Sequence, residues 1–182
     1  ELTEAMLAHF EDPEEGGFFF TADDHETLLL RPKPGLDDAI PSGNGVAASL
    51  LVRLGHLLGE PRYLEAAERT FSLFGSELQN QPAAYGSLTL ALEALQEPAP
   101  VIVIRGPASS LPRWQSRLAE HYTPGQVVLA IPADAPNLPG LLAERRPSGE
   151  METTAYLCRG THCRLPISGL EQLVEDLSAA SP

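Results

Sequence analysis

Two polar stretches near the start of the chain carry groups that could act on a sugar. The first is the acidic cluster from Asp23 to Glu26, and the second runs from Asp37 to Asn44. Carboxylates and a histidine can move protons at a ring carbon or a glycosidic oxygen, and Ser and Asn side chains can hold hydroxyl groups. No residue is assigned as catalytic. The candidate ligand-binding residues are Asp23, Asp24, His25, Asp38, Ser42 and Asn44.

The path between these two stretches bears on whether they form one site. Only residues 31–36 separate them, and Pro32 and Pro34 favour an extended backbone there, so both stretches could flank the mouth of one cavity. A structural interpretation stands beside this one. Ser42 or Asn44 can cap the following helix, and the acids can form a solvated turn.

The two cysteines, Cys158 and Cys163, form a second candidate group, with His162 beside the second sulfur. No further Cys or His pair stands at ligand spacing, so we predict no metal site. A redox pair is compatible with the spacing, because a short loop can bring two sulfurs within disulfide reach. Arg159 and Arg164 would then lower a thiol pKa. The alternative is two partly buried thiols that close the last strand.

The first half of the chain has helical periodicity. From Ser42 to Gln96 the apolar residues recur at helical spacing, and Gly59 followed by Pro61 marks the end of one helix and the start of the next. A second helix is expected to extend through Leu78, and a third to cover about 84–95. Short connections predict antiparallel helical hairpins. The Gly-rich, aromatic stretch before them, residues 16–30, favours an extended segment or a small hairpin.

The period changes after the Pro-rich boundary at 97–100. Residues 101–104, 126–131 and 153–158 have the pattern of buried strands. They alternate with expected helices from Ser110 to about His121, over 138–144 and after Ser168. This alternation predicts a three-stranded parallel sheet with flanking helices, and domains at 1–97 and 98–182. The first strand lacks a phosphate-binding glycine loop, so no nucleotide cofactor is expected.

Composition limits the partners. Twelve basic against 25 acidic residues give a net charge of −13, which repels nucleic acid and anionic lipid, so neither is expected as a partner. No stretch of this sequence is apolar over a membrane-spanning length, and no basic-then-apolar segment precedes a small-residue cleavage site in it. Two cysteines are too few for a disulfide-built secreted scaffold, so we expect a cytoplasmic location. Because the chain opens at Glu1, we expect a piece of a longer protein.

Several of these motifs resemble a known family of thioredoxin-domain-containing proteins, the spermatogenesis-associated protein 20 family. The resemblance covers nearly the whole chain and is most specific in its first 50 residues. One departure is Gly45, where the resemblance implies Ser, so that a hydroxyl would be missing at the start of that helix. The motifs that carry the resemblance are Gly16–Glu26, Arg31–Lys33, Asp38–Asn44 with Val46–Ala48, Ala155–Cys158 and Cys163–Ile167.

This resemblance implies a thioredoxin-like domain, a six-hairpin α/α toroid like that of six-hairpin glycosidases, and then a tail. The chain would be mainly α with an α/β tail, a partial toroid whose partner is the rest of its own protein. We expect the whole protein to bind or transform a carbohydrate-like small molecule in the toroid cavity, with this part not itself catalytic. The alternative is an interaction or redox-accessory module. A partial toroid would expose the face of Phe71, Phe74 and Leu78 and favour self-association.

Overall fold

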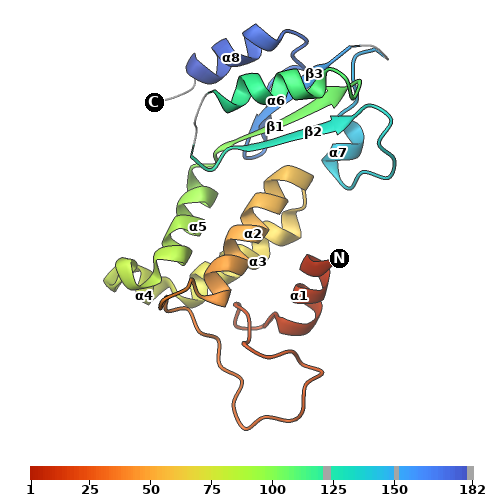
Figure 1. Ribbon diagram of the computed structural model, residues 1–182. Coiled ribbons are helices and arrows are strands. Elements are labelled where there is room, and N and C mark those ends of the chain that lie inside the picture. The colour runs from red at the N-terminus through yellow and green to blue at the C-terminus, as the bar shows by residue number, and fades with distance from the viewer. Residues whose placement is uncertain (121–123, 150–151, 180–182) are drawn as a thin grey trace. The chain divides into compact units, whose positions relative to one another are not determined.

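The computed structural model describes residues 1–120, 124–149 and 152–179. The chain divides into two compact units (Figure 1). The first, here the helical unit, comprises Glu1–Gly55 and Glu60–Glu97. The second, here the α/β unit, comprises His56–Gly59 and Pro98–Pro182.

The first unit is built from helices that pack on one another. Gly59 has a φ of +69°, the left-handed conformation expected of a glycine that ends a helix, and Pro61 opens the next helix as predicted. The expected second helix is broken at Phe74, whose backbone is not helical. The last turn of α2, from His56 on, is assigned to the α/β unit. The helices are α1 (Leu2–Phe10), α2 (Gly43–Leu58), α3 (Pro61–Leu73), α4 (Gly75–Asn80), the 3₁₀ helix η1 (Pro82–Tyr85) and α5 (Gly86–Gln96).

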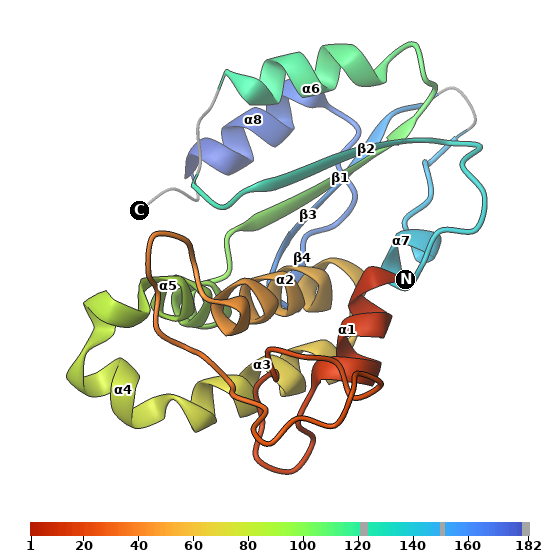
Figure 2. The ribbon, with the colours of Figure 1, turned by 60° about the horizontal axis from the view of Figure 1, so that its bottom comes forward.

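The core of this unit lies among α2, α3 and α5. In both views of the ribbon α2 and α3 lie side by side (Figures 1 and 2). Small side chains on α2, such as Ala47 and Ala48, are buried and let the helices approach closely. The expected exposure of the face of Phe71, Phe74 and Leu78 is wrong for the two phenylalanines, which are buried, whereas Leu78 is half-buried. Self-association stays a prediction. The Phe74 ring lies against Gly35, where an added Cβ would meet ring atom Cδ1 at 2.7 Å.

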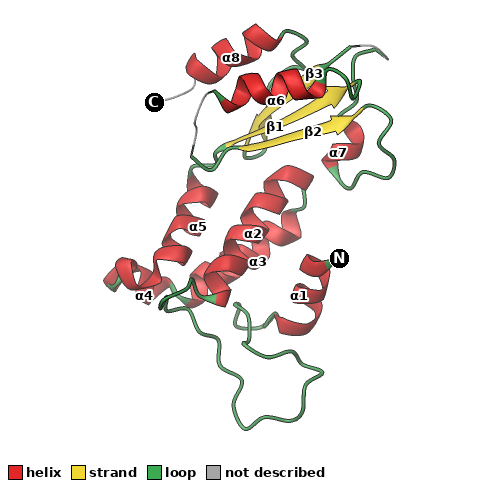
Figure 3. Cartoon of the chain, viewed as in Figure 1, coloured by secondary structure: helices red, strands yellow, loops and turns green. Residues whose placement is uncertain are grey.

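A long segment between α1 and α2, residues 11–42, has neither helix nor strand beyond one bridge (Figure 3). Glu11 and Phe18 form that antiparallel bridge, a minimal hairpin that closes through the left-handed Gly16 and Gly17. Arg31 donates a hydrogen bond to the carbonyl of Thr21, and Lys33 pairs with Asp12 at 2.8 Å. The segment therefore has a defined path that its own side chains hold.

The sheet of the α/β unit is mixed, which corrects the predicted three-stranded parallel sheet. Its order is β2-β1-β3-β4, from β1 (Pro100–Gly106), β2 (Val127–Pro132), β3 (Thr154–Arg159) and β4 (His162–Cys163). Only β1 and β2 are parallel, joined through α6 (Leu111–Ala119). A parallel β3 would need a crossover long enough to return across the sheet. Within the described residues of the connection the one helix is the single turn α7 (Leu141–Glu144), and β3 runs antiparallel to β1.

Helices cover the two faces of this sheet unequally. Alternate residues of β1 and β3, among them Ile102 and Leu157, pack with Trp114 of α6 and Leu173 of α8 (Leu170–Ala179), so both long helices lie on one face (Figures 1 and 2). The opposite face of β1 packs on Leu142 of α7. His121, in the predicted first helix of this unit, lies outside the described residues. Among the described residues no helix is long and apolar enough to cross a bilayer.

Candidate functional site

Asn44 uses its side chain inside the protein. Its carboxamide oxygen accepts a hydrogen bond from the backbone N–H of Phe18 at 2.7 Å. Its amide nitrogen donates to the carbonyls of Phe18 and Pro34, each at 2.9 Å. The side chain is 1% exposed. Asn44 therefore ties the segment 11–42 to the start of α2.

Ser42 belongs to a second internal network centred on Asp37. The Asp37 carboxylate accepts hydrogen bonds from the backbone N–H groups of Ser42 and Ser87 and from the Ser87 hydroxyl. Ser42 Oγ accepts a hydrogen bond from the N–H of Gly45, as a helix cap does. Burial alone would raise the pKa of Asp37, but the hydrogen bonds from Ser87 and Ser42 outweigh burial and hold that pKa below its ordinary value.

The remaining candidates of this region are exposed. Asp23, Asp24, His25 and Asp38 all lie on the surface of the helical unit. Asp23 accepts a hydrogen bond from His9 Nδ1 at 2.8 Å, and this bond raises the pKa of His9. Ligand atoms of His9, Asp23 and Asp24 lie within 4.8 Å of one another. Sequence reasoning had singled out Asp23 and Asp24 without their neighbour from α1. Their part in ligand binding stays a prediction.

Gly45 has a packing reason that the sequence did not reveal. A Cβ at position 45 would clash with the Ser87 hydroxyl and lie 2.6 Å from Ser87 Cβ. Ser87 of α5 thus occupies the space that a side chain at position 45 would need.

We expect Gly45→Ser to lower the free energy of unfolding by about 1–3 kcal/mol, because the added side chain overpacks the contact between α2 and α5. Gly43→Ser is the matched control, since it lies on the same helix and nothing lies within 4 Å of an added Cβ there. Urea denaturation of the two variants measures the difference. Equal stabilities would contradict the close contact at Ser87.

The structure joins Cys158 and Cys163 in a disulfide. They are directly opposite each other on β3 and β4. Cys158 is 2% exposed, whereas Cys163 lies open to solvent. A hollow of about 240 Å³ beside the bond is lined by Leu157, Cys158, Arg159, His162, Cys163 and Arg164.

A cation that the sequence did not suggest lies beside these sulfurs. Arg145 Nη2 lies 3.4 Å from Cys158 Sγ and 3.8 Å from Cys163 Sγ. Arg145 is 5% exposed, and its Nη1 has no hydrogen-bond partner within the described residues. Burial lowers the pKa of this guanidinium. Arg164, by contrast, pairs with Asp176 at 2.8 Å.

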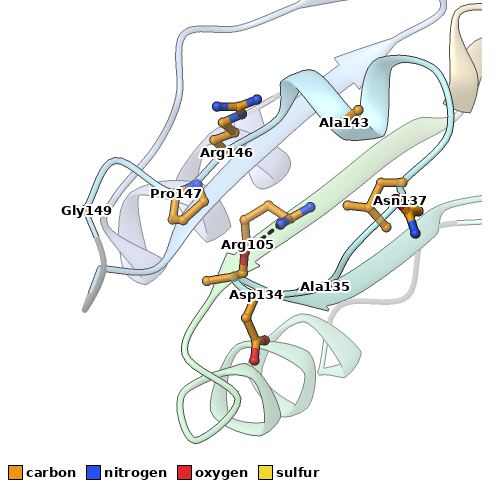
Figure 4. Close-up of a pocket in the computed structure, with 10 residues that line it drawn as sticks. Arg105, Asp134, Ala135, Asn137, Ala143, Arg146, Pro147 and Gly149 are labelled. Carbon is orange, nitrogen blue, oxygen red and sulfur yellow. Dashed lines mark hydrogen bonds between the residues drawn. The ribbon is translucent and has the colours of Figure 1, made fainter.

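A larger cavity of about 830 Å³ opens at the carboxyl ends of β1 and β2. Arg105, the penultimate residue of β1, extends into the space between the segments that carry Asn137 and Arg146 (Figure 4). Arg105 is buried and donates one hydrogen bond, to the carbonyl of Ala133 at 3.1 Å. The lining residues are Arg105, Ala133, Asp134, Ala135, Asn137, Leu138, Ala143, Arg146, Pro147 and Gly149.

The electrostatics of this cavity centre on an uncompensated cation. Arg105 Nε has no hydrogen-bond partner, and within the described part of the chain no carboxylate pairs with Arg105. Asp134 points away from the Arg105 guanidinium in Figure 4. Burial lowers the pKa of Arg105. A sequence signal existed, because an Arg directly after four buried β-branched residues places a charge at the end of a central strand.

The comparisons with known proteins cover most of the chain. No protein-family model matches. Human spermatogenesis-associated protein 20 is 30% identical over 167 residues, which cover 87% of this chain and 21% of that protein. Its mouse counterpart is 29% identical over 167 residues, with the same coverage. An uncharacterised protein of Caenorhabditis elegans is 24% identical over 161 residues, 87% of this chain and 22% of that protein.

The chain is homologous to the C-terminal part of spermatogenesis-associated protein 20. The family resemblance predicted from the motifs is thus confirmed. The chain spans about a fifth of the length of the curated relatives that it matches. The name spermatogenesis-associated protein 20 states no reaction or ligand.

Proposed function

We propose that the α/β unit binds a small molecule through an anionic group, a carboxylate or a phosphate, held at Arg105. The observation that carries this proposal is a buried guanidinium that faces a cavity and lacks a carboxylate partner among the described residues. A buried charge without a partner is costly, and an anionic ligand would remove that cost. Guanidinium groups suit this task because they bind carboxylate and phosphate oxygens through two parallel hydrogen bonds.

The position and size of the cavity support the same function. Ligands of α/β sheets bind outside the carboxyl ends of parallel strands. Arg105 lies at the carboxyl end of β1, and Asp134 follows β2. A volume of about 830 Å³ falls in the range of small-molecule sites. Arg146 adds a second cation to the lining, and Asn137 adds an amide.

This proposal narrows the carbohydrate-like ligand expected of the whole protein to one that carries an acidic group. The chain has a net charge of −13, which disfavours a polyanion at long range but leaves room for a small anion at a local cluster of arginines. In this proposal the chain binds and does not catalyse. The reacting groups, if the whole protein has them, belong to its other parts.

Titration of the full chain with glucose 6-phosphate, inorganic phosphate and glucose tests the proposal by calorimetry. We expect glucose 6-phosphate to bind and glucose not to bind. Arg105→Gln should weaken binding of the phosphorylated sugar about tenfold or more, because a charge-assisted hydrogen-bond pair contributes about 1.5–3 kcal/mol. Arg113→Gln, an exposed position on α6, is the control and should bind normally.

Two results of the titration would contradict the proposal. One is unchanged binding of the phosphorylated sugar by a folded Arg105→Gln chain, and the other is no binding of any anionic probe. Binding of neutral glucose that is lost in Asp24→Ala but kept in Arg105→Gln would favour the second candidate. That candidate is a carbohydrate site at Asp23 and Asp24, which the closeness of His9 to both carboxylates supports.

A further inference from the structure

We propose that the Cys158–Cys163 disulfide is a reversible thiol–disulfide exchange site that a dithiol reductant opens by attack on Cys163. The two sulfurs differ in access. Cys163 lies on β4, at the edge of the sheet, and is exposed, whereas Cys158 lies on β3 and is buried. An incoming thiolate can approach only the exposed sulfur, so the buried sulfur is the leaving group.

Arg145 makes Cys158 a good leaving group. Its guanidinium lies 3.4 Å from Cys158 Sγ and is buried, with Nη1 unpartnered in the described structure. A buried cation without an anion is unfavourable, and a Cys158 thiolate would supply that anion. Glu144 and Tyr156 lie close enough to favour the charged form of Arg145, but their effect on its pKa is smaller than that of burial. Arg159, His162 and Arg164 line the hollow beside the sulfurs.

The exchange can be written with its electrons and protons balanced. One thiolate of the dithiol attacks Cys163 Sγ, a new S–S bond forms, and the bond to Cys158 breaks with its electron pair on Cys158 Sγ. The second thiol of the reductant, after losing its proton to solvent, attacks the reductant's own sulfur in the mixed disulfide. Cys163 leaves as a thiolate and takes a proton from solvent. The dithiol is oxidised by two electrons, and the cystine is reduced by two.

A purely structural role explains the bond less well. The cysteines are five positions apart and close a hairpin that already has its own strand pairing. The entropy that a disulfide removes from the unfolded chain grows with loop length, so a bond across so short a loop stabilises the fold less than a bond across a long loop would. Nor does a structural role require a buried guanidinium at the sulfurs.

Mapping the mixed disulfide tests the direction of attack. The folded, oxidised full chain is treated with glutathione, quenched with acid and alkylated. Cleavage after Arg159 and Arg164 puts Cys158 and Cys163 on separate peptides for mass spectrometry. We expect glutathione on Cys163 and the alkyl group on Cys158. Glutathione on Cys158, or a bond that reacts only after denaturant unfolds the chain, would overturn the proposal.

The role of Arg145 is tested at equilibrium in a glutathione redox buffer. Arg145→Gln should lower the ratio of reduced to oxidised chain about tenfold, since the Cys158 thiolate loses its cation. Arg145→Lys should restore most of the ratio, and Arg113→Gln should not change it. An equal ratio in folded Arg145→Gln and in the parent chain would overturn this role.

A measurement that needs no Arg145 variant covers the case in which Arg145→Gln does not fold. In Cys163→Ser the remaining thiol is Cys158 alone, and its ionisation is followed by thiolate absorbance against pH. We expect its pKa below that of an ordinary thiol. A pKa at or above the ordinary value would overturn the proposal, because burial without the effect of Arg145 raises a thiol pKa.

Discussion

Asn44→Ala is expected to lower the free energy of unfolding of the helical unit by about 3 kcal/mol. The substitution removes three hydrogen bonds and leaves the buried N–H of Phe18 without an acceptor. The parts of the segment 11–42 around Phe18 and Pro34 then lose their hydrogen bonds to the start of α2. Urea denaturation followed by circular dichroism measures the loss, and faster proteolysis within residues 20–30 should accompany it.

Asn80→Ala is the matched control for this loss. Asn80 also bonds a backbone carbonyl, that of Ser76, but it is exposed at the end of α4. Its substitution should change stability by less than about 0.5 kcal/mol. If Asn44→Ala and Asn80→Ala were equally stable, the buried Asn44 network would not hold the segment.

Trp114→Ala should have the largest effect in the α/β unit, a loss of about 3–5 kcal/mol. Trp114 is the chain's one tryptophan, 6% exposed, and it fills the space between α6 and the face of β1 and β3 that α8 also covers. Removing the indole leaves a cavity. The other core residues of α6 and α8 still pack on the sheet, so these helices cannot move in to close it. Thermal unfolding by circular dichroism, with the disulfide kept oxidised, measures the loss.

Two further variants serve as controls for the Trp114→Ala measurement. Trp114→Phe keeps an aromatic ring in the same space and should lose clearly less stability than Trp114→Ala. Leu165→Ala removes an apolar side chain that is 87% exposed and should be near neutral. A Trp114→Ala chain as stable as Leu165→Ala would contradict the core assignment.

The sequence predicted the features that local chemistry determines. Gly59 and Pro61 located the boundary between α2 and α3, and the β-branched run 101–104 located β1, because each signal acts within a few residues. It did not predict the direction of β3. An apolar strand pattern is the same whether the strand runs parallel or antiparallel to its neighbour. The length of the helix before β3 distinguishes a parallel from an antiparallel β3, and that length was not evident from the pattern.

The candidate sites show the same division between near and distant residues. Disulfide reach between Cys158 and Cys163 was expected from their spacing. Arg145, which directly follows α7, lies 13 positions before Cys158 and 18 before Cys163, so spacing did not reveal its contact with the sulfurs. Arg105 and Asp37 are likewise hydrogen-bonded to residues distant in sequence, Ala133 and Ser87. Ser42 and Asn44 have polar side chains in a promising motif, yet their hydrogen bonds turn inward, and spacing alone does not reveal that.

The short strand β4 has a consequence for how the sheet could grow. An exposed sheet edge is a template for strands of other chains. On the β3 side, β4 pairs with one end of β3, and Ile167 bonds Ala155 near the other end, so the outer side of β3 is taken at both ends. At the opposite edge no described strand covers β2. Intermolecular strand addition, and with it any β-type aggregation of this unit, would therefore start from β2.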